Sequence, residues 1–136
     1  MTDIYLSLGS NLGDRHALLL SAIEELIGKV GPLIAASSFI ETEPWGFESD
    51  HPFLNAVVHM RTDLTARELL ATTQGIERSL GRTEKTGCNG YADRTIDIDI
   101  LLFGDEQINE PDLVIPHPLM HERDFVMKPL KELCSL

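Results

Sequence analysis

The sequence DRTIDIDILLFG, residues 93–104, alternates isoleucine and aspartate at its centre. Successive side chains of an extended chain point to opposite faces, so the three isoleucines share one face and Asp97 and Asp99 share the other. β-Branched residues favour strands, whereas aspartate is depleted in them. The segment therefore predicts a strand that buries one face and presents two carboxylates on the other.

Two helices are predicted in the sequence before this strand. Residues 11–32 carry apolar residues at 18, 19, 23, 26, 27 and 30, the stripe of an amphipathic helix, and Gly31 and Pro32 end it. Thr65 and Glu68 have capping-box spacing, which predicts a second helix over 66–81. Further strands are predicted over 3–10, 33–44 and 53–63, extended chain over 111–118, and a short terminal helix over 121–133.

The predicted order is strand, helix, strand, strand, helix, strand. This order is typical of the ferredoxin-like α+β fold, an antiparallel sheet with helices packed on it. Neither an internal repeat nor a linker is visible, so we expect residues 1–136 to form a single domain.

Composition favours a folded protein of the cytoplasm. Hydrophobic residues make up 43%, no apolar run approaches the ~20 residues that span a bilayer, and the N-terminus does not resemble a secretory signal. Cys88 and Cys134 lack metal-type spacing and are expected to be free thiols. A net charge of −11 argues against nucleic acid as a partner, but not against a small anionic ligand. We expect a monomer without membrane contacts.

The two aspartates favour a divalent cation. Their Cα atoms should lie about 6.6 Å apart, at ~3.3 Å per residue, and carboxylates that close repel each other unless a cation lies between them. Mg²⁺ takes one or two carboxylates and completes its shell with water and substrate phosphates, and a pair of ions can serve phosphoryl transfer. The alternative is two incidental acids on a solvated sheet face.

Basic residues near this strand suggest a phosphate-bearing substrate. Arg82, Lys85 and Arg94 flank one loop, and Arg side chains are suited to phosphate oxygens. No Walker-type loop is present, and LGSNLGD is interpreted as a strand-to-helix turn. His117 and His121 have the i, i+4 spacing of zinc ligands, but a histidine that donates to phosphate fits an anionic ligand better.

The motifs LGSNLGDR, ETEPWG, FLNAVV, GR, DRTIDIDILLFG, IPHP and HERDFV occur in this order over essentially the whole chain. Together they resemble those of the 6-hydroxymethyl-7,8-dihydropterin pyrophosphokinases of folate biosynthesis. The resemblance implies a ferredoxin-like fold and transfer of pyrophosphate from ATP to the hydroxymethyl oxygen of a reduced pterin, with release of AMP.

The resemblance also implies roles for individual residues. Asp97 and Asp99 are expected to bind two Mg²⁺ ions and, with Arg82 and Arg94, to serve catalysis. The residues expected to bind ATP are Leu70, Gln74, Glu77, Arg82, Arg94, Ile100, His117 and Arg123. The residues expected to bind the pterin are Thr42, Trp45, Phe53, Asn55 and Phe125. A flat pterin suits aromatic faces and an amide, although core packing is the alternative role for each aromatic residue.

The sequence departs from the family pattern in the loop over 81–93. Some members carry RWGPR before the aspartate strand, whereas this chain has CNGYADR at 88–94, with Tyr91 as the candidate lid aromatic, and Glu84 at a position that is basic in those members. We expect ATP and Mg²⁺ to order this loop as a lid. Arg94 should then matter more for ATP binding and Arg82 more for the chemical step.

Three other functions remain open from the sequence. A palm-like nucleotidyltransferase or cyclase also places two aspartates on a ferredoxin-like sheet, but it releases pyrophosphate. A small-molecule-binding regulatory module shares the fold without such an aspartate pair. An RNA-binding sheet is opposed by the acidic charge.

Overall fold

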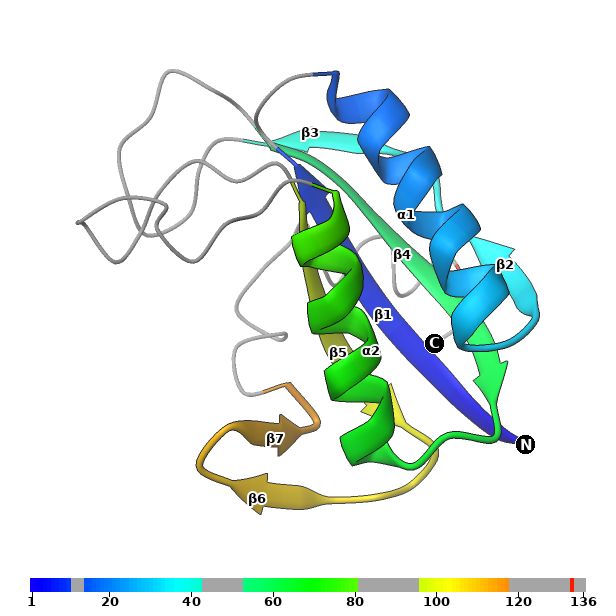
Figure 1. Cartoon of the computed structure of the whole chain (residues 1–136), viewed down its shortest axis with the longest axis vertical. Coiled ribbons are helices and arrows are strands. Elements are labelled where there is room, and N and C mark those ends of the chain that lie inside the picture. The colour runs from blue at the N-terminus through cyan, green and yellow to red at the C-terminus, as the bar shows by residue number, and fades with distance from the viewer. Residues whose placement is uncertain (11–13, 43–52, 81–95, 118–132, 134–136) are drawn as a thin grey trace.

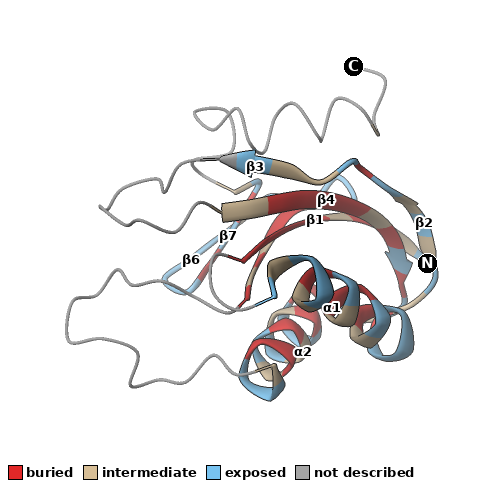
Figure 2. Ribbon diagram, turned by 90° about the horizontal axis from the view of Figure 1, so that it is seen from above, coloured by how far each residue is buried: buried red, intermediate tan, exposed pale blue. Residues whose placement is uncertain are grey.

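The computed structural model describes residues 1–10, 14–42, 53–80, 96–117 and 133. Two helices lie against one face of an antiparallel sheet (Figure 1), and the view in Figure 2 shows both on the same side. The elements of the described ranges are β1 (Thr2–Ser10), α1 (Arg15–Lys29), β2 (Leu33–Ala36), β3 (Ile40–Thr42), β4 (Phe53–Thr62), α2 (Ala66–Ser79), β5 (Asp97–Phe103), β6 (Ile108–Glu110) and β7 (Leu113–Ile115).

β1 lies between β4 and β5 and pairs with both in antiparallel fashion. The order across the sheet is β2–β4–β1–β5, with β3 also paired to β4. If β2 and β3 are taken as one interrupted strand, the chain follows the predicted strand, helix, strand, strand, helix, strand order. The ferredoxin-like α+β prediction is confirmed.

The predicted strand over 33–44 is wrong in one respect, because the structure divides it into β2 and β3. The division follows from Ser37, whose amide donates to the Val57 carbonyl (2.9 Å) and whose hydroxyl oxygen accepts from the Val57 amide (2.9 Å). The Ser37 hydroxyl thus takes the place of a backbone carbonyl as the acceptor for the Val57 amide. Serine side chains often compete in this way with backbone groups for hydrogen bonds.

Both helices begin with an N-terminal cap, of which only the cap of α2 is predicted from the sequence. The Asp14 side chain accepts a hydrogen bond from Ala17 N (3.1 Å) at the start of α1, and Thr65 and Glu68 form the predicted capping box of α2. The apolar stripe of α1 is confirmed except at Ile27, which is 46% exposed. No helix in the described ranges is long and apolar enough to span a membrane.

A β6–β7 hairpin follows β5 where only extended chain over 111–118 is predicted from the sequence. Glu110 pairs with Leu113, so Pro111 and Asp112 form a tight turn between two three-residue strands. Leu113 and Ile115 are buried in the main core. The predicted terminal helix over 121–133 lies outside the described residues except for its last position, Leu133.

Candidate functional site

β5 presents its two carboxylates as the alternation predicts. Ile98 and Ile100 are buried on the helix-covered side, whereas Asp97 and Asp99 are only half-buried. Asp97 lies opposite Gly9 and Asp99 lies opposite Ser7 on β1. The two acids therefore share the sheet face that lies away from the helices.

The donors at this position are suited to a hard divalent cation. Two carboxylates on one strand face, both accessible from solvent, supply the oxygen ligands that Mg²⁺ prefers. Within the described ranges, no group of three or more His, Cys, Asp and Glu side chains could hold a metal ion. An ion between Asp97 and Asp99 would thus take its remaining ligands from water and from substrate oxygens.

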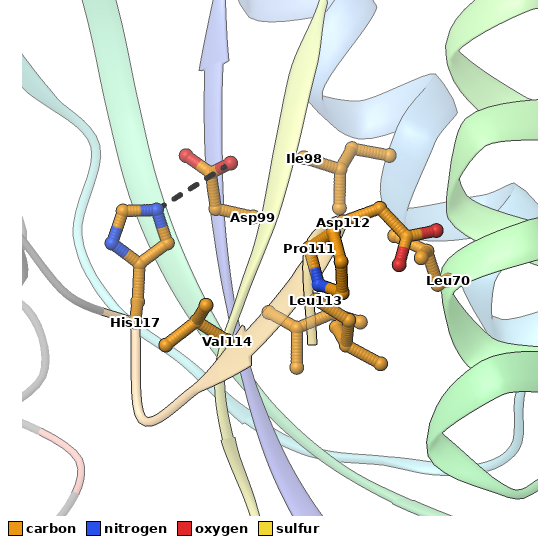
Figure 3. Close-up of a pocket in the computed structure, with 9 residues that line it drawn as sticks. Leu70, Ile98, Asp99, Pro111, Asp112, Leu113, Val114 and His117 are labelled. Atoms are coloured by element: carbon orange, nitrogen blue, oxygen red, sulfur yellow. Dashed lines mark ion pairs between the residues drawn. The ribbon is translucent and has the colours of Figure 1, made fainter. Parts of the chain in front are cut away.

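His117 lies beside Asp99 at the end of the hairpin. Its Nε2 is 3.9 Å from Asp99 Oδ1 (Figure 3), and its side chain is 18% exposed. The His117 amide donates to the Leu101 carbonyl (3.1 Å), at the point where the register between β5 and β1 shifts by one residue. This bulge lets the strand hold His117 next to the carboxylate.

Glu77 of α2 contacts the backbone of the aspartate strand. Glu77 is 7% exposed, and its Oε2 accepts a hydrogen bond from the Ile98 amide at 2.8 Å. Ile98 stands between Asp97 and Asp99, so this contact fixes the backbone that carries both acids. The sequence places Glu77 among the ATP residues without indicating this role.

A cavity of about 290 Å³ lies next to Asp99, between α2, β5 and the β6–β7 hairpin. Its lining residues are Leu70, Ile98, Asp99, Ile100, Pro111, Asp112, Leu113, Val114 and His117 (Figure 3). Three residues predicted from the sequence to contact ATP, namely Leu70, Ile100 and His117, thus meet at one cavity. Gln74 is exposed on α2 and does not line it.

Predicted pterin residues meet on the other side of β1. Asn55 pairs with both Gly9 and Ile40, and Thr42 pairs with Phe53. Asn55 is 3% exposed, and its Nδ2 donates to the Ile40 carbonyl at 3.4 Å. Because Gly9 also faces Asp97, Asn55 and Asp97 are separated by two strand spacings, or about 10 Å.

Gly9 leaves room between these groups. A Cβ atom at Gly9 would lie 3.0 Å from Asn55 Oδ1 and 3.4 Å from the Phe53 ring. The absence of a side chain therefore lets both groups approach the central strand closely. In the sequence, Gly9 lies near the end of the predicted strand over 3–10 and within the turn motif LGSNLGD, and the register of β1 is needed to show its contacts.

Several predicted site residues lie outside the described residues. These are Trp45, Arg82, Arg94, Arg123 and Phe125, together with Lys85, Tyr91, Glu84, His121 and the predicted lid over 81–93. The backbone of Thr42 is described and its side chain is not.

Asp112, which lines the cavity, belongs to a cluster of charged residues that was not predicted from the sequence. Arg67 on α2 pairs with Asp112 (Nη1 to Oδ2, 2.8 Å) and with Glu110 on the hairpin. Hydrogen bonding from Arg67 lowers the pKa of Asp112 below its ordinary value of 3.8, and the two carboxylates together raise the pKa of Arg67. The sequence signal for this turn is Pro-Asp directly before the short apolar stretch Leu113–Ile115.

Comparison with known proteins identifies one family over nearly the whole chain. Residues 5–135 match the family model described as 7,8-dihydro-6-hydroxymethylpterin-pyrophosphokinase (HPPK). A 2-amino-4-hydroxy-6-hydroxymethyldihydropteridine pyrophosphokinase of Porphyromonas gingivalis is 56% identical, over 97% of this chain and 90% of that protein. The Bacillus subtilis protein of the same name is 44% identical, over 96% of this chain and 77% of its own length.

Solved structures agree with the fold. A crystal structure of Plasmodium falciparum HPPK-DHPS superposes with a TM-score of 0.75 at 18% identity, over 97% of this chain and 41% of that one. An HPPK-DHPS in complex with substrates gives a TM-score of 0.71 at 16% identity, over 97% of this chain and 40% of that one. This chain therefore corresponds to about two fifths of each longer protein.

Proposed function

Because this chain belongs to the 7,8-dihydro-6-hydroxymethylpterin-pyrophosphokinase family, we infer that it transfers pyrophosphate from ATP to 6-hydroxymethyl-7,8-dihydropterin. The products are the pterin diphosphate and AMP, and the reaction is a step of folate biosynthesis. The chain is thus an ATP-dependent diphosphokinase, a transferase. The structural observation that supports this function most directly is the register of β1, which sets Asp97 and Asn55 opposite the same glycine.

The reaction requires two substrates to meet in line. The hydroxymethyl oxygen attacks the β-phosphorus of ATP, and the bond from that phosphorus to the oxygen shared with the α-phosphate breaks. AMP leaves with the electron pair of that bond, and the hydroxyl proton is lost. In such a transfer the protein contributes mainly by positioning the reactants and by stabilising the charge that develops. A site with the acids on β5 and the pterin groups on β4 and β3 is suited to holding the acceptor beside the phosphates.

ATP is the co-substrate and the reaction uses magnesium. We propose two Mg²⁺ ions, held by the carboxylates of Asp97 and Asp99. When bound, the ions offset the negative charge of the phosphate oxygens and of the leaving AMP. His117, beside Asp99, is suited to contact a phosphate bound at the same position.

We propose that the base and ribose of ATP occupy the cavity next to β5. Leu70 and Ile100 line it, which supports the assignment. The other proposed ATP residues are Gln74, Glu77, Arg82, Arg94, His117 and Arg123, of which Glu77 acts through its hydrogen bond to β5. Arg82 and Arg94 are proposed as catalytic residues of a lid over 81–93.

We propose that the pterin lies against β4 and β3, next to the carboxylates. Asn55 carries an amide suited to the edge of the pterin ring, and Phe53 and Gly9 lie beside it. Thr42, Trp45 and Phe125 complete the proposed set. We further propose a monomeric single domain over 1–136, located in the cytoplasm, with no partner among membranes or nucleic acids.

The experiment identifies the reaction products and tests the two carboxylates, Asp97 and Asp99, by substitution. Purified chain with ATP, Mg²⁺ and the dihydropterin should release AMP and form a pterin diphosphate, detected by chromatography. Asp97→Ala and Asp99→Ala should fold normally and lose nearly all turnover, because each removes a proposed metal ligand. Free pyrophosphate as the main product would favour a nucleotidyltransferase, and near wild-type turnover in either variant would contradict the metal assignment.

A further inference from the structure

One wall of the nucleotide cavity is a hairpin that has little stability of its own. β6 and β7 each contain three residues and pair only with each other within the described sheet residues. A two-stranded hairpin of this length is marginal in water and depends on contacts with the rest of the protein. Leu113 and Ile115 supply such contacts on the inner side, where both are buried in the core. These contacts hold β7 but not the turn.

The turn of the hairpin, Pro111 and Asp112, is bound on its solvent-exposed side by one side chain of α2, Arg67. Arg67 bonds Asp112 within the turn and Glu110 immediately before it. The planar guanidinium can bond two carboxylates at once, so the pair of contacts fixes direction as well as distance. The three side chains are about half exposed (50%, 63% and 47% for Arg67, Asp112 and Glu110), and exposed ion pairs contribute little to global stability. A local effect on the turn is therefore the effect to look for.

The turn that Arg67 holds is part of the cavity wall. Pro111 and Asp112 line the cavity opposite Leu70, whereas Glu110 and Arg67 do not line it. Without Arg67, the carboxylates of Glu110 and Asp112 would repel each other, and Asp99 adds a further carboxylate to the same cavity wall as Asp112. The turn would then move away from α2, and the cavity would widen.

We propose that Arg67 is a positioning residue for ATP, which holds the turn Pro111–Asp112 against α2 so that the cavity closes on the nucleoside end of the nucleotide. The proposal rests on the proposed function for the identity of the nucleotide. It concerns binding rather than chemistry, because Arg67, Glu110 and Asp112 are not among the residues proposed to hold the reacting phosphates, which belong with Asp97 and Asp99. Loss of Arg67 should weaken nucleotide binding equally in the ground state and the transition state, which raises KM and spares kcat.

The first experiment compares two arginines in steady-state kinetics. Arg67→Ala should raise the KM for ATP by roughly fivefold, with kcat and the KM for the pterin within about twofold of wild type. Arg61→Ala is the matched control, since Arg61 is similarly exposed (52%) and pairs with Asp3, at the end of the sheet away from Gly9 and Asp97, in an ion pair that does not involve the hairpin. It should change none of these constants. A fall in kcat for Arg67→Ala, or an equal rise in KM for Arg61→Ala, would overturn the proposal.

A double-mutant cycle tests whether Arg67 acts through the hairpin. Glu110→Gln removes a partner that does not line the cavity, so it should raise the KM for ATP only through Arg67, and the double variant should be no worse than Arg67→Ala alone. Arg67→Lys should rescue part of the loss. Fully additive effects, or no effect of Glu110→Gln, would refute the mechanism. Melting temperatures of the variants exclude global unfolding as the cause.

Calorimetric titration with ATP and Mg²⁺ in the absence of pterin separates this proposal from the proposed function. Weaker ATP binding by Arg67→Ala than by wild type supports the positioning role even if no pterin diphosphate forms. Unchanged binding overturns that role even if the enzyme transfers pyrophosphate normally.

Discussion

Gly9 shows how a missing side chain can define a site. Its position opposite both Asn55 and Asp97 puts it between the two proposed substrates. In Gly9→Ala the new Cβ would meet Asn55 Oδ1 at 3.0 Å, so the amide must shift. We expect the KM for the pterin to rise by about tenfold, in line with the ~1–3 kcal/mol that overpacking costs, while the KM for ATP stays near wild type. Steady-state kinetics with each substrate varied in turn measures both constants.

Gly28→Ala is the matched control for this substitution. Nothing lies within 4 Å of a Cβ at Gly28, which is exposed on α1. Alanine should there stabilise the helix by about 0.5–1 kcal/mol and leave both KM values unchanged. If the two variants behave alike, the contact with Asn55 has no role in pterin binding.

Glu77 gives a prediction about the strand that carries the carboxylates. Glu77→Ala leaves the Ile98 amide without its acceptor, and an unsatisfied buried donor costs about 1–3 kcal/mol. We expect the free energy of unfolding from urea titration to fall by that amount, with faster hydrogen exchange at the Ile98 amide. Glu77→Gln retains a carbonyl oxygen and should lose less. Slow exchange at Ile98 in Glu77→Ala would show that the contact does not hold β5.

At the scale of residues, the sequence predicts those features of the site that depend on the periodicity of a single strand or helix. The alternation around Asp97 and Asp99 is local, so the face shared by the two acids could be inferred without a structure. The contact of Arg67 with Asp112 joins α2 to a hairpin distant in sequence, and no local pattern indicates which carboxylate an exposed arginine will meet. The same holds for Glu77 and the Ile98 amide, which come together only through packing of α2 on β5.

At the scale of elements, α2 depends on its N-terminal capping box. Thr65 Oγ1 accepts from the Glu68 amide (3.1 Å), and Glu68 Oε1 accepts from the Thr65 amide (2.8 Å). Thr65→Ala should lower the free energy of unfolding by about 1 kcal/mol, measured by urea titration. Thr72→Ala is the control within the same helix, because its hydroxyl only bonds back to the Glu68 carbonyl and should be dispensable. Equal losses in both variants would argue against a specific contribution from the cap.

The two elements that differ from the sequence prediction do so for physical reasons. The predicted strand over 33–44 carries β-favouring residues on both sides of Ser37, and this pattern does not reveal that the Ser37 hydroxyl will take a backbone partner and interrupt the strand. The β6–β7 hairpin is too short to produce a clear periodic pattern, and it is stabilised by burial of Leu113 and Ile115 against the rest of the protein. The two helices and the central strands are long enough to show a clear periodic pattern, and their order was predicted.

At the scale of the whole molecule, charge sets the response to acid. Hydrogen bonds from His59 and Arg61 lower the pKa of Asp3, and a hydrogen bond from Arg67 lowers that of Asp112, both from an ordinary value of 3.8. A carboxyl group with a lowered native pKa contributes stability that is fully present above its unfolded pKa and is lost as the pH falls through the native pKa. These two contributions are therefore intact from pH 7 down to about pH 4 and disappear below it.

The net charge acts in the other direction over the upper part of that range. The chain carries −11 at pH 7, and partial protonation towards its pI of about 4.7 relieves self-repulsion. We expect the urea midpoint at pH 5 to equal or exceed that at pH 7 and to fall steeply below about pH 4. The double variant Asp3→Asn, Asp112→Asn should lose less between pH 5 and pH 3 than wild type. An identical loss would assign acid sensitivity to other groups.

The central place of β1 has a consequence for biosynthesis of the chain. A ribosome makes β1 before either of its neighbours, so the nascent strand has no sheet partner until β4 has left the exit tunnel. Gly9 can pair with Asn55 once β4 has emerged, and with Asp97 only after β5 has emerged. Sheets built from such non-local pairings close late. A nascent chain that lacks β5 therefore has the Asn55 side of the site but not the Asp97 side. Binding that needs both sides can begin only after the ribosome has synthesised β5.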